Sequence, residues 1–323
     1  MDRPYFPQWG FASPIERHVS MLFLVAQIAK EHGNGAKPIN ILEIGSWVGG
    51  SLLTWAHGIR TFNGGNGSIL AIDPLEPFRN VEVEKGAPNF ARVMDLLLRN
   101  ELPYRTLRHN IGFADIKGGA SHLRESSRQI GDHLRDDHFD IVYVDGEHGY
   151  AGVMRDLQIS SRVLADQGVL CGDDLEVQAH QLPSGFLDKN RDALDATIPG
   201  STSAFHPGVT AAVDELFGPV EEHLGFWNVR RDGERFVPVR CPPTDVKIPG
   251  HIPERLHGHF NSSSGKDACV RRPITSWNVR NWFPETPEVL PAVRRSPAPP
   301  EARHGPCFVR FHAPGQRRRP LRR

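Results

Sequence analysis

The sequence predicts an α/β protein with a doubly wound, mostly parallel sheet that ends in an antiparallel hairpin. Over the first 240 residues, short apolar runs alternate with segments of helical spacing, which is typical of successive β–α units. Continuous rather than alternating apolar runs indicate strands that are covered on both faces. Two β-rich stretches meet at Asp232-Gly233, a residue pair that favours a hairpin turn.

The first elements are the clearest ones. Residues 39–44 (INILEI) and 67–72 (GSILAI) are apolar runs of strand length, followed by glycine and by aspartate. Between them, residues 50–60 have helical spacing. In residues 89–99 apolar side chains recur at intervals that place them on one face of a helix, at Phe90, Val93, Met94, Leu97 and Leu98.

The later elements continue the alternation. A weaker apolar segment at 104–108 predicts the third strand, and the run FDIVYV at 139–144 predicts the fourth. In chain order, the other expected elements are helices at 120–134 and 153–164, a strand at 168–172, a helix that begins at Pro207-Gly208, and strands at 225–230 and 234–240. The sheet is therefore expected to contain seven strands.

Charge and proline content divide the chain after residue 240. The whole chain has 38 basic and 38 acidic residues, yet residues 241–323 hold 13 Arg and 2 Lys against 6 acidic residues, and 14 of the 27 prolines. Prolines at this density interrupt helices and sheets, so we expect 241–323 to be a disordered tail. The segment 1–38, with an apolar helix at 20–30, is expected to cover the domain 39–240 as a lid or to pair with a second copy of the chain.

Composition excludes several classes of protein. The chain has no net charge and 24% charged residues, which argues against a disordered acidic or basic protein. Its 4 cysteines form no CxxC pair and are too few for a disulfide scaffold, so a cytoplasmic location is expected. The longest apolar run, 21–29, is far shorter than the roughly 20 residues of a membrane helix. For the basic tail we expect weak attraction to anions rather than specific nucleic-acid binding.

A glycine-rich loop follows the first predicted strand. In open α/β sheets, ligands bind beyond the carboxyl ends of the strands. The run Glu43-Ile-Gly45-Ser46-Trp-Val-Gly49 lies at such an end, and its glycines allow a ligand to approach the backbone at a helix N-terminus. Asp73 ends the second strand and is placed to accept hydrogen bonds from ribose hydroxyls. Together the two features predict a site for a nucleoside-containing cofactor.

Acidic residues crowd the ends of the fourth and fifth strands. Asp145 follows one strand, and the pair Asp173-Asp174 ends the other. Three neighbouring carboxylates repel one another unless they are protonated or neutralised by a cation, and oxygen ligands favour Mg²⁺, Mn²⁺ or Ca²⁺ over zinc. His148, three residues after Asp145, is the expected proton acceptor near neutral pH.

These motifs resemble those of class I S-adenosylmethionine-dependent methyltransferases, most of all the macrocin-type and mycinamicin-type sugar O-methyltransferases. The resemblance covers roughly residues 35–240 and implies a Rossmann-like methyltransferase fold with S-adenosyl-L-methionine as cofactor. It implies cofactor contacts at Glu43, Gly45, Ser46, Gly49 and Asp73, with Asn110 and Ile111 beside the adenine after the third strand. It implies Mg²⁺ or Mn²⁺ ligands at Asp145, Asp173 and Asp174, and catalytic roles for His148 and Asp145.

The implied reaction is methyl transfer to a hydroxyl of a sugar or glycosylated small molecule. The metal would bind two substrate hydroxyls, and His148 would remove the proton from the reacting one. A methyltransferase of catechol-type hydroxyls would use the same residues. Two further alternatives remain: a nicotinamide-dependent oxidoreductase, which the missing GxGxxG motif disfavours, and a non-catalytic adaptor, which the intact Asp145, His148 and Asp173 disfavour.

Overall fold

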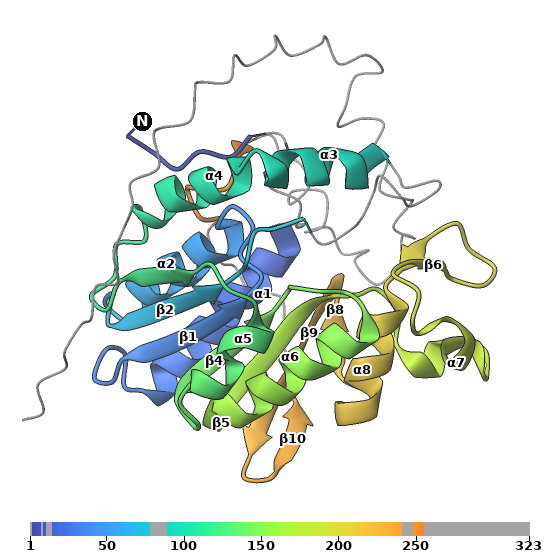
Figure 1. Cartoon of the computed structure of the whole chain (residues 1–323). Helices are drawn as coiled ribbons and strands as arrows, with labels where there is room; N and C mark the ends of the chain where they lie inside the picture. The colour runs from blue at the N-terminus through green and yellow to red at the C-terminus, as the bar shows by residue number, and fades with distance from the viewer. Residues whose placement is uncertain (1, 8, 11–14, 78–88, 241–247, 255–323) are drawn as a thin grey trace, which may run out of the picture. The chain divides into compact units, whose positions relative to one another are not determined.

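A computed structural model describes residues 2–7, 9–10, 15–77, 89–240 and 248–254. At its centre lies an eight-stranded sheet (Figure 1). Its strands are β1 (Ile39–Ile44), β2 (Gly67–Ile72), β3 (Ala120–Leu123), β4 (Phe139–Val144), β5 (Leu164–Leu175), β8 (Glu221–His223), β9 (Gly225–Asp232) and β10 (Arg235–Pro238). They lie in the order β10-β9-β5-β4-β1-β2-β3, with β8 paired to β9. The predicted fold class is confirmed, and the three-residue β8 adds one strand to the seven expected.

Register places the ends of the central strands side by side. Strand β1 pairs in parallel with both β2 and β4, and β4 pairs in parallel with β5. Ile44 lies opposite Val144, and Val144 lies opposite Gly172. The residues that follow these positions therefore meet at one edge. On the far side of β5, the antiparallel hairpin β9–β10 closes the sheet.

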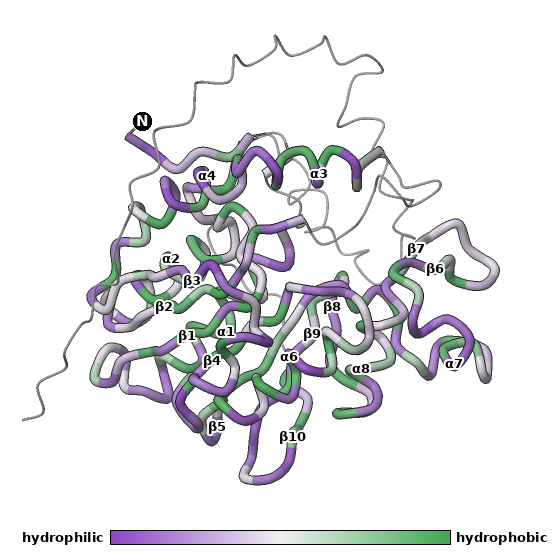
Figure 2. Tube along the Cα trace, in the orientation of Figure 1, coloured by the Kyte–Doolittle hydropathy of each residue, from purple (hydrophilic) through white to green (hydrophobic). Residues whose placement is uncertain are grey.

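Helices cover both faces of the sheet (Figure 1). They are α1 (Ile15–Glu31), α2 (Gly50–Phe62), α3 (Asn89–Arg99), α4 (Leu102–Ile111), α5 (Ser127–Ile130), α6 (Tyr150–Val163), α7 (Phe186–Asn190) and α8 (Pro207–Phe217), and a small hairpin of β6 (Ala196–Thr197) and β7 (Ala204–Phe205) follows α7. One core cluster joins α1 and α2 to the sheet around Trp55 and Tyr143, and a second joins α6 and α8 to it around Leu157 and Trp227. Hydrophobic stretches of the chain follow the central strands (Figure 2). None of the helices described is long and apolar enough to cross a membrane.

The third strand lies elsewhere than the sequence predicts. Residues 104–108 belong to α4, which has a proline in its first turn and buries Leu107 and Asn110 on one side; proline is favoured at that helix position. The strand that pairs with β2 is β3, within the segment expected to be a helix. Its four residues alternate between half-buried and exposed, as in an edge strand, so the apolar run that marks a buried strand is absent.

Part of the predicted tail belongs to the domain. Ile252 is buried and packs with Phe6, Val19 and Ile248. His251 Nε2 lies 3.1 Å from the hydroxyl of Thr54 and 3.2 Å from the carbonyl oxygen of Gly50. Residues 248–254 are thus anchored to α1 and α2, and the rest of the predicted tail, 241–247 and 255–323, lies outside the described residues.

Candidate active site

The loop between β1 and α2 is fixed by the strand ends around it. Gly45 has a φ of 87°, and a Cβ atom there would overlap the carbonyl group of Asp145, so this position requires glycine. The backbone N–H of Gly45 donates to Ile72, and that of Asp145 donates to Ile44, both at 2.8 Å. The loop therefore rests directly on the ends of β2 and β4, and Gly49 leads into the N-terminus of α2.

Asp73 holds this loop through its carboxylate. Its Oδ2 accepts hydrogen bonds from the backbone N–H groups of Ser46 and Trp47, each at 2.9 Å, and its Oδ1 accepts one from Leu75 at 2.8 Å. Burial raises the pKa of Asp73 against the effect of these backbone donors. A carboxylate has about four acceptor sites, so one remains for a ligand. Asp73, predicted to bind ribose, thus first shapes the loop.

Two polar atoms beside the loop are buried without a hydrogen bond. They are Oε2 of Glu43 and Oγ of Ser46. Ser51 donates to the other oxygen of Glu43, yet burial raises the pKa of Glu43 to about 8. Buried polar atoms in native proteins nearly always have partners. The inner wall of the loop therefore offers unfilled acceptor positions suited to a polar or cationic ligand.

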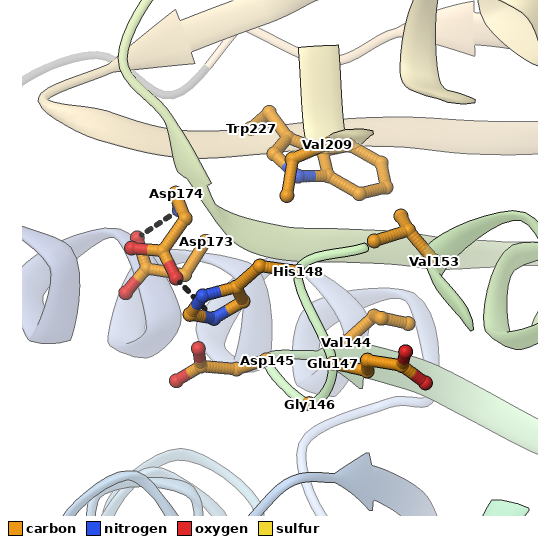
Figure 3. A pocket seen from close by; sticks show the side chains of 10 residues that line it. All are labelled: Val144, Asp145, Gly146, Glu147, His148, Val153, Asp173, Asp174, Val209 and Trp227. Carbon is orange, nitrogen blue, oxygen red and sulfur yellow. Dashed lines mark hydrogen bonds and ion pairs between the residues drawn. The ribbon is translucent and has the colours of Figure 1, made fainter. Parts of the chain in front are cut away.

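The carboxyl ends of β4 and β5 border a small hollow (Figure 3). Asp145, His148, Asp173 and Asp174 lie on one side of it, and Val153, Val209 and Trp227 are among its apolar lining. The Tyr143 hydroxyl lies 3.0 Å from Oδ2 of Asp145 and 3.4 Å from Oδ2 of Asp173. Burial and the charges of the two other aspartates raise the pKa of Asp145 well above its usual value.

His148 pairs with Asp174. Its Nε2 lies 2.9 Å from Oδ2 of that carboxylate. Burial opposes a charge on His148, but the charge and hydrogen bond of Asp174 prevail and raise its pKa. For Asp174, burial is likewise outweighed by His148, His206 and Arg17, and its pKa falls below the usual range. An ion pair between imidazolium and carboxylate is thus favoured in the free protein.

His206 stands against His148 with its ring edge-on, at 4.3 Å between ring centroids. Its Nδ1 lies 3.2 Å from Glu176, and its Nε2 lies 3.5 Å from Asp195. Burial is opposed by these acids and by Asp174, and the pKa of His206 rises to about 9. His206 begins α8 as its N-cap, so this helix brings a second, charged imidazole to the site.

Arg17 is a site residue that sequence reasoning missed. From the first turn of α1, its guanidinium binds Asp173 through Nη1, and the same nitrogen lies 3.5 Å from Oδ1 of Asp174. Its Nε donates to the carbonyl oxygen of Leu224 at 2.8 Å. The side chain is 4% exposed. The hint in the sequence is an arginine in the first turn of a helix whose middle is apolar.

The predicted metal ligands do not form a ligand set. Asp173 is engaged by Arg17, by Tyr143 and by the backbone N–H of Asp174. Within the described part of the chain, the ligand atoms that converge, to within 4.8 Å, belong to His148, Asp174 and His206. That set offers two nitrogens and one oxygen, whereas Mg²⁺ prefers oxygen ligands. Asp145, Asp173 and Asp174 as arranged therefore do not fit the divalent ion that the sequence predicts.

Asn110 and Ile111 lie in α4, not after the third strand, so the basis for placing them beside an adenine was wrong. The side chain of Asn110 is fully buried. Its Oδ1 accepts from the N–H of Tyr5, and its Nδ2 donates to Tyr5 and Val48 at 3.0 and 2.7 Å. The residue that follows β3 is Arg124, whose guanidinium lies 4.4 Å from the ring centre of Tyr104. Asn110 instead fastens the N-terminal segment to the glycine-rich loop.

Comparison with known proteins agrees with this arrangement. Residues 42–175, from β1 through β5, match a family model described as a methyltransferase domain. No curated protein matches the chain. Among solved structures, cofactor-bound Rv0187 from MTB is 15% identical over 51% of this chain, with a TM-score of 0.35, and the chain spans 58% of its length.

Two further structures cover more of the chain. TomG, an O-methyltransferase from Streptomyces achromogenes solved with SAM, is 14% identical over 66% of this chain and 79% of its own, with a TM-score of 0.40. CalS11, a TDP-rhamnose 3′-O-methyltransferase, is 13% identical over 67% and 77%, with a TM-score of 0.37.

Residues 42–175 thus match a methyltransferase domain, in line with the enzyme class that the sequence predicts. The residues around the loop fit this cofactor. Glu43 and Ser46 present the buried, unpartnered polar atoms, and Asp73 keeps one acceptor position. S-adenosylmethionine has a cationic ammonium and ribose hydroxyls that suit such groups.

Proposed function

We propose that the protein transfers the methyl group of S-adenosylmethionine to a hydroxyl of a sugar or glycosylated small molecule. The observation that carries the proposal is the His148–Asp174 pair, 2.9 Å apart, beside the small hollow at the strand ends. The hollow lies at the edge where Gly45 packs against Asp145. A proton acceptor and a cofactor loop therefore share one edge of the sheet, which is what methylation of a hydroxyl requires.

Glu43, Ser46 and Asp73 are the residues that would hold the cofactor. The bound cofactor supplies an activated methyl group on a sulfonium. Because Glu43 is buried with one oxygen unpaired, a ligand cation would favour its ionised form and lower its raised pKa. Asp73, fixed by three backbone donors, keeps the loop in shape before and during binding.

His148 accepts the proton of the reacting hydroxyl. Only the neutral form of His148 acts as the base: with Nε2–H donated to Asp174, its lone pair is on Nδ1, which takes the proton, and because the pKa of His148 is raised this form gains population as pH rises. Asp174 orients the ring and stabilises the imidazolium that forms, since its carboxylate lies 2.9 Å from Nε2. No step is assigned to a metal ion, because the predicted oxygen ligands are engaged by Arg17 and Tyr143.

Polar side chains at the rim suit a sugar-type acceptor. Asp145, Glu147 and His148 line the hollow, and His206 with Glu176 stands beside them. Carboxylates and imidazoles are suited to hydrogen-bond several hydroxyls at once. Val153, Val209 and Trp227 in the same lining suit an aromatic ring, so catechols belong in the test as the competing acceptor class.

The test is formation of S-adenosylhomocysteine with a panel of glycosides, sugar nucleotides and catechols. We expect turnover with at least one sugar-bearing acceptor and its loss in His148→Ala. His133→Ala is the matched control, because His133 is an exposed histidine outside the site. Turnover restricted to catechols would overturn the acceptor class, and full activity of His148→Ala would overturn the role of this residue.

A further inference from the structure

We propose that the guanidinium of Arg17 is the counter-cation of Asp173 and Asp174. Arg17 thereby takes the role that a divalent metal ion would otherwise have, and it positions Asp174 for His148. This inference rests on the proposed function for the role of His148, but its charge argument stands on geometry alone. Arg17 comes from α1, the segment expected to serve as a lid or dimer surface. It is instead part of the interior of the site, at 4% exposure.

The guanidinium of Arg17 lies against the β8–β9 turn at Leu224 and Gly225, which we call the seat of Arg17. The turn between β8 and β9 consists of Leu224, with φ 53°, and Gly225, with φ 86°. Leu224 turns its carbonyl oxygen to Nε of Arg17 at 2.8 Å. A Cβ atom on Gly225 would lie 2.5 Å from Nη2. Two left-handed residues are the usual geometry of a two-residue hairpin turn. Here that turn presents a carbonyl oxygen to the arginine and, at Gly225, the space that its guanidinium occupies.

Two cationic side chains of the chain itself pair with the carboxylates of the site. Arg17 pairs with Asp173, and His148 pairs with Asp174. Asp145 shares the Tyr143 hydroxyl with Asp173. Crowded carboxylates need a cation or a proton, and here the chain supplies two cations of its own. A divalent ion bound by Asp173 would have to displace a buried guanidinium.

Arg17 also fixes the orientation of Asp174. Its Nη1 lies 3.5 Å from Oδ1 of Asp174, while His148 lies 2.9 Å from Oδ2 of the same carboxylate. The two carboxylate oxygens of Asp174 thus contact different cations. Turning the carboxylate out of its plane about the Cβ–Cγ bond would lengthen both contacts. Arg17 acts on the proton acceptor through Asp174 and is a positioning residue.

Mn²⁺ binding to the full chain tests the proposal without any acceptor. We expect wild type and Arg17→Lys to bind Mn²⁺ only weakly, and Arg17→Met to bind it at least tenfold more tightly, because the acids lose their internal cation. The gain should disappear in the double variant Arg17→Met with Asp173→Asn. Arg230→Met is the matched control, since Arg230 pairs with Glu31 of α1 away from these acids. Titration calorimetry and the electron paramagnetic resonance of free Mn²⁺ measure the affinity.

Activity provides a second readout. Wild-type turnover should persist in the presence of a chelator. Arg17→Met should lower kcat at least tenfold with little change in KM for the cofactor, and Mn²⁺ should restore part of the lost kcat. Tight Mn²⁺ binding by wild type that Asp173→Asn removes, or loss of wild-type turnover in chelator, would overturn the proposal. If Arg17→Met does not fold, the wild-type and Asp173→Asn measurements still decide. If no acceptor is found, the Mn²⁺ affinities decide on Arg17 while the proposed function fails separately.

Discussion

Oδ2 of Asp174 lies 2.9 Å from Nε2 of His148, and this contact joins the end of β5 to the loop after β4. His148→Ala should lower turnover by roughly 10²–10⁴-fold, the usual contribution of a general base. Affinity for S-adenosylhomocysteine should stay within about twofold of wild type, because the cofactor loop is untouched. Steady-state kinetics and titration calorimetry measure the two quantities. A parallel loss of cofactor affinity would place His148 in the cofactor site instead.

Asp73→Ala should weaken cofactor binding through the loop. The substitution removes the acceptor for the N–H groups of Ser46, Trp47 and Leu75, and a lost bond to a charged group costs about 1.5–3 kcal/mol. We expect S-adenosylhomocysteine affinity to fall by at least roughly tenfold. Asp115→Ala, at an exposed aspartate, is the control. Unchanged affinity in a folded Asp73→Ala protein would contradict this role.

Gly225→Ala should destabilise the fold at the seat of Arg17. The new Cβ would lie 2.5 Å from the guanidinium at a φ of 86°, so strain and displacement of a buried ion pair add to one another, at roughly 2–4 kcal/mol. Gly233→Ala has a similar positive φ of 61° but nothing within 4 Å, so it should cost only about 1 kcal/mol. Urea unfolding compares the two. Equal losses would show that the seat is unimportant.

Asp156 should make stability depend on pH. Burial, opposed by the hydrogen bond from Ser127, raises its pKa to about 6, so the folded state binds the proton more tightly than the unfolded state does. The stability linked to this proton is present at low pH and is lost as pH rises from about 4 to about 6, by roughly 3 kcal/mol in total.

Asp156→Asn should therefore be more stable than wild type above pH 6. The advantage should grow by roughly 1 kcal/mol between pH 5 and pH 8, because an amide keeps the bond to Ser127 without the buried charge. Unfolding curves at the two pH values give the difference. A difference that does not change with pH would mean that Asp156 is not the group responsible.

Truncation should locate the end of the domain. A chain that ends at residue 254 retains the packing of Ile252 and the contacts of His251 with Thr54 and Gly50. A chain that ends at residue 240 loses them, and burial of one isoleucine is worth about 1.5–3 kcal/mol. We expect the shorter chain to melt at a lower temperature. Identical melting of the two chains would restore the boundary predicted at 240.

The sequence predicts an element well when the residues of that element themselves carry the signal, and poorly when contacts with distant residues determine it. Strands β1, β2 and β4 are continuous apolar runs, and each is found at the predicted residues. Strand β3 has half-exposed edge positions, so its pattern lacks the signal of a buried strand, and the error carried over to Asn110 and Ile111. Residues 248–254 pack against the domain through only a few side chains. The proline and charge content of 241–323 as a whole gives no sign of so short a packed segment.

The site divides in the same way. Glu43, Asp73, Asp145, His148 and Asp174 stand at strand ends that the sequence locates. What each carboxylate does there depends on the donors that reach it, and those come from loop conformation or from distant segments. The backbone donors of Asp73 follow from the shape of the loop, and the donor of Asp173 comes from α1. Neither has a local signature in the sequence.

The contact between Arg17 and Leu224 spans 207 positions of the chain. Such a distant closure is made late, because the entropy of the intervening chain must be lost before the contact forms. During synthesis, Arg17 emerges early and the β8–β9 turn emerges after nearly all of the sheet. In every shorter nascent chain Arg17 is present but lacks the carbonyl oxygen of Leu224 that holds its guanidinium beside the acids. Methyl transfer is expected only from a protein whose last hairpin has already been added.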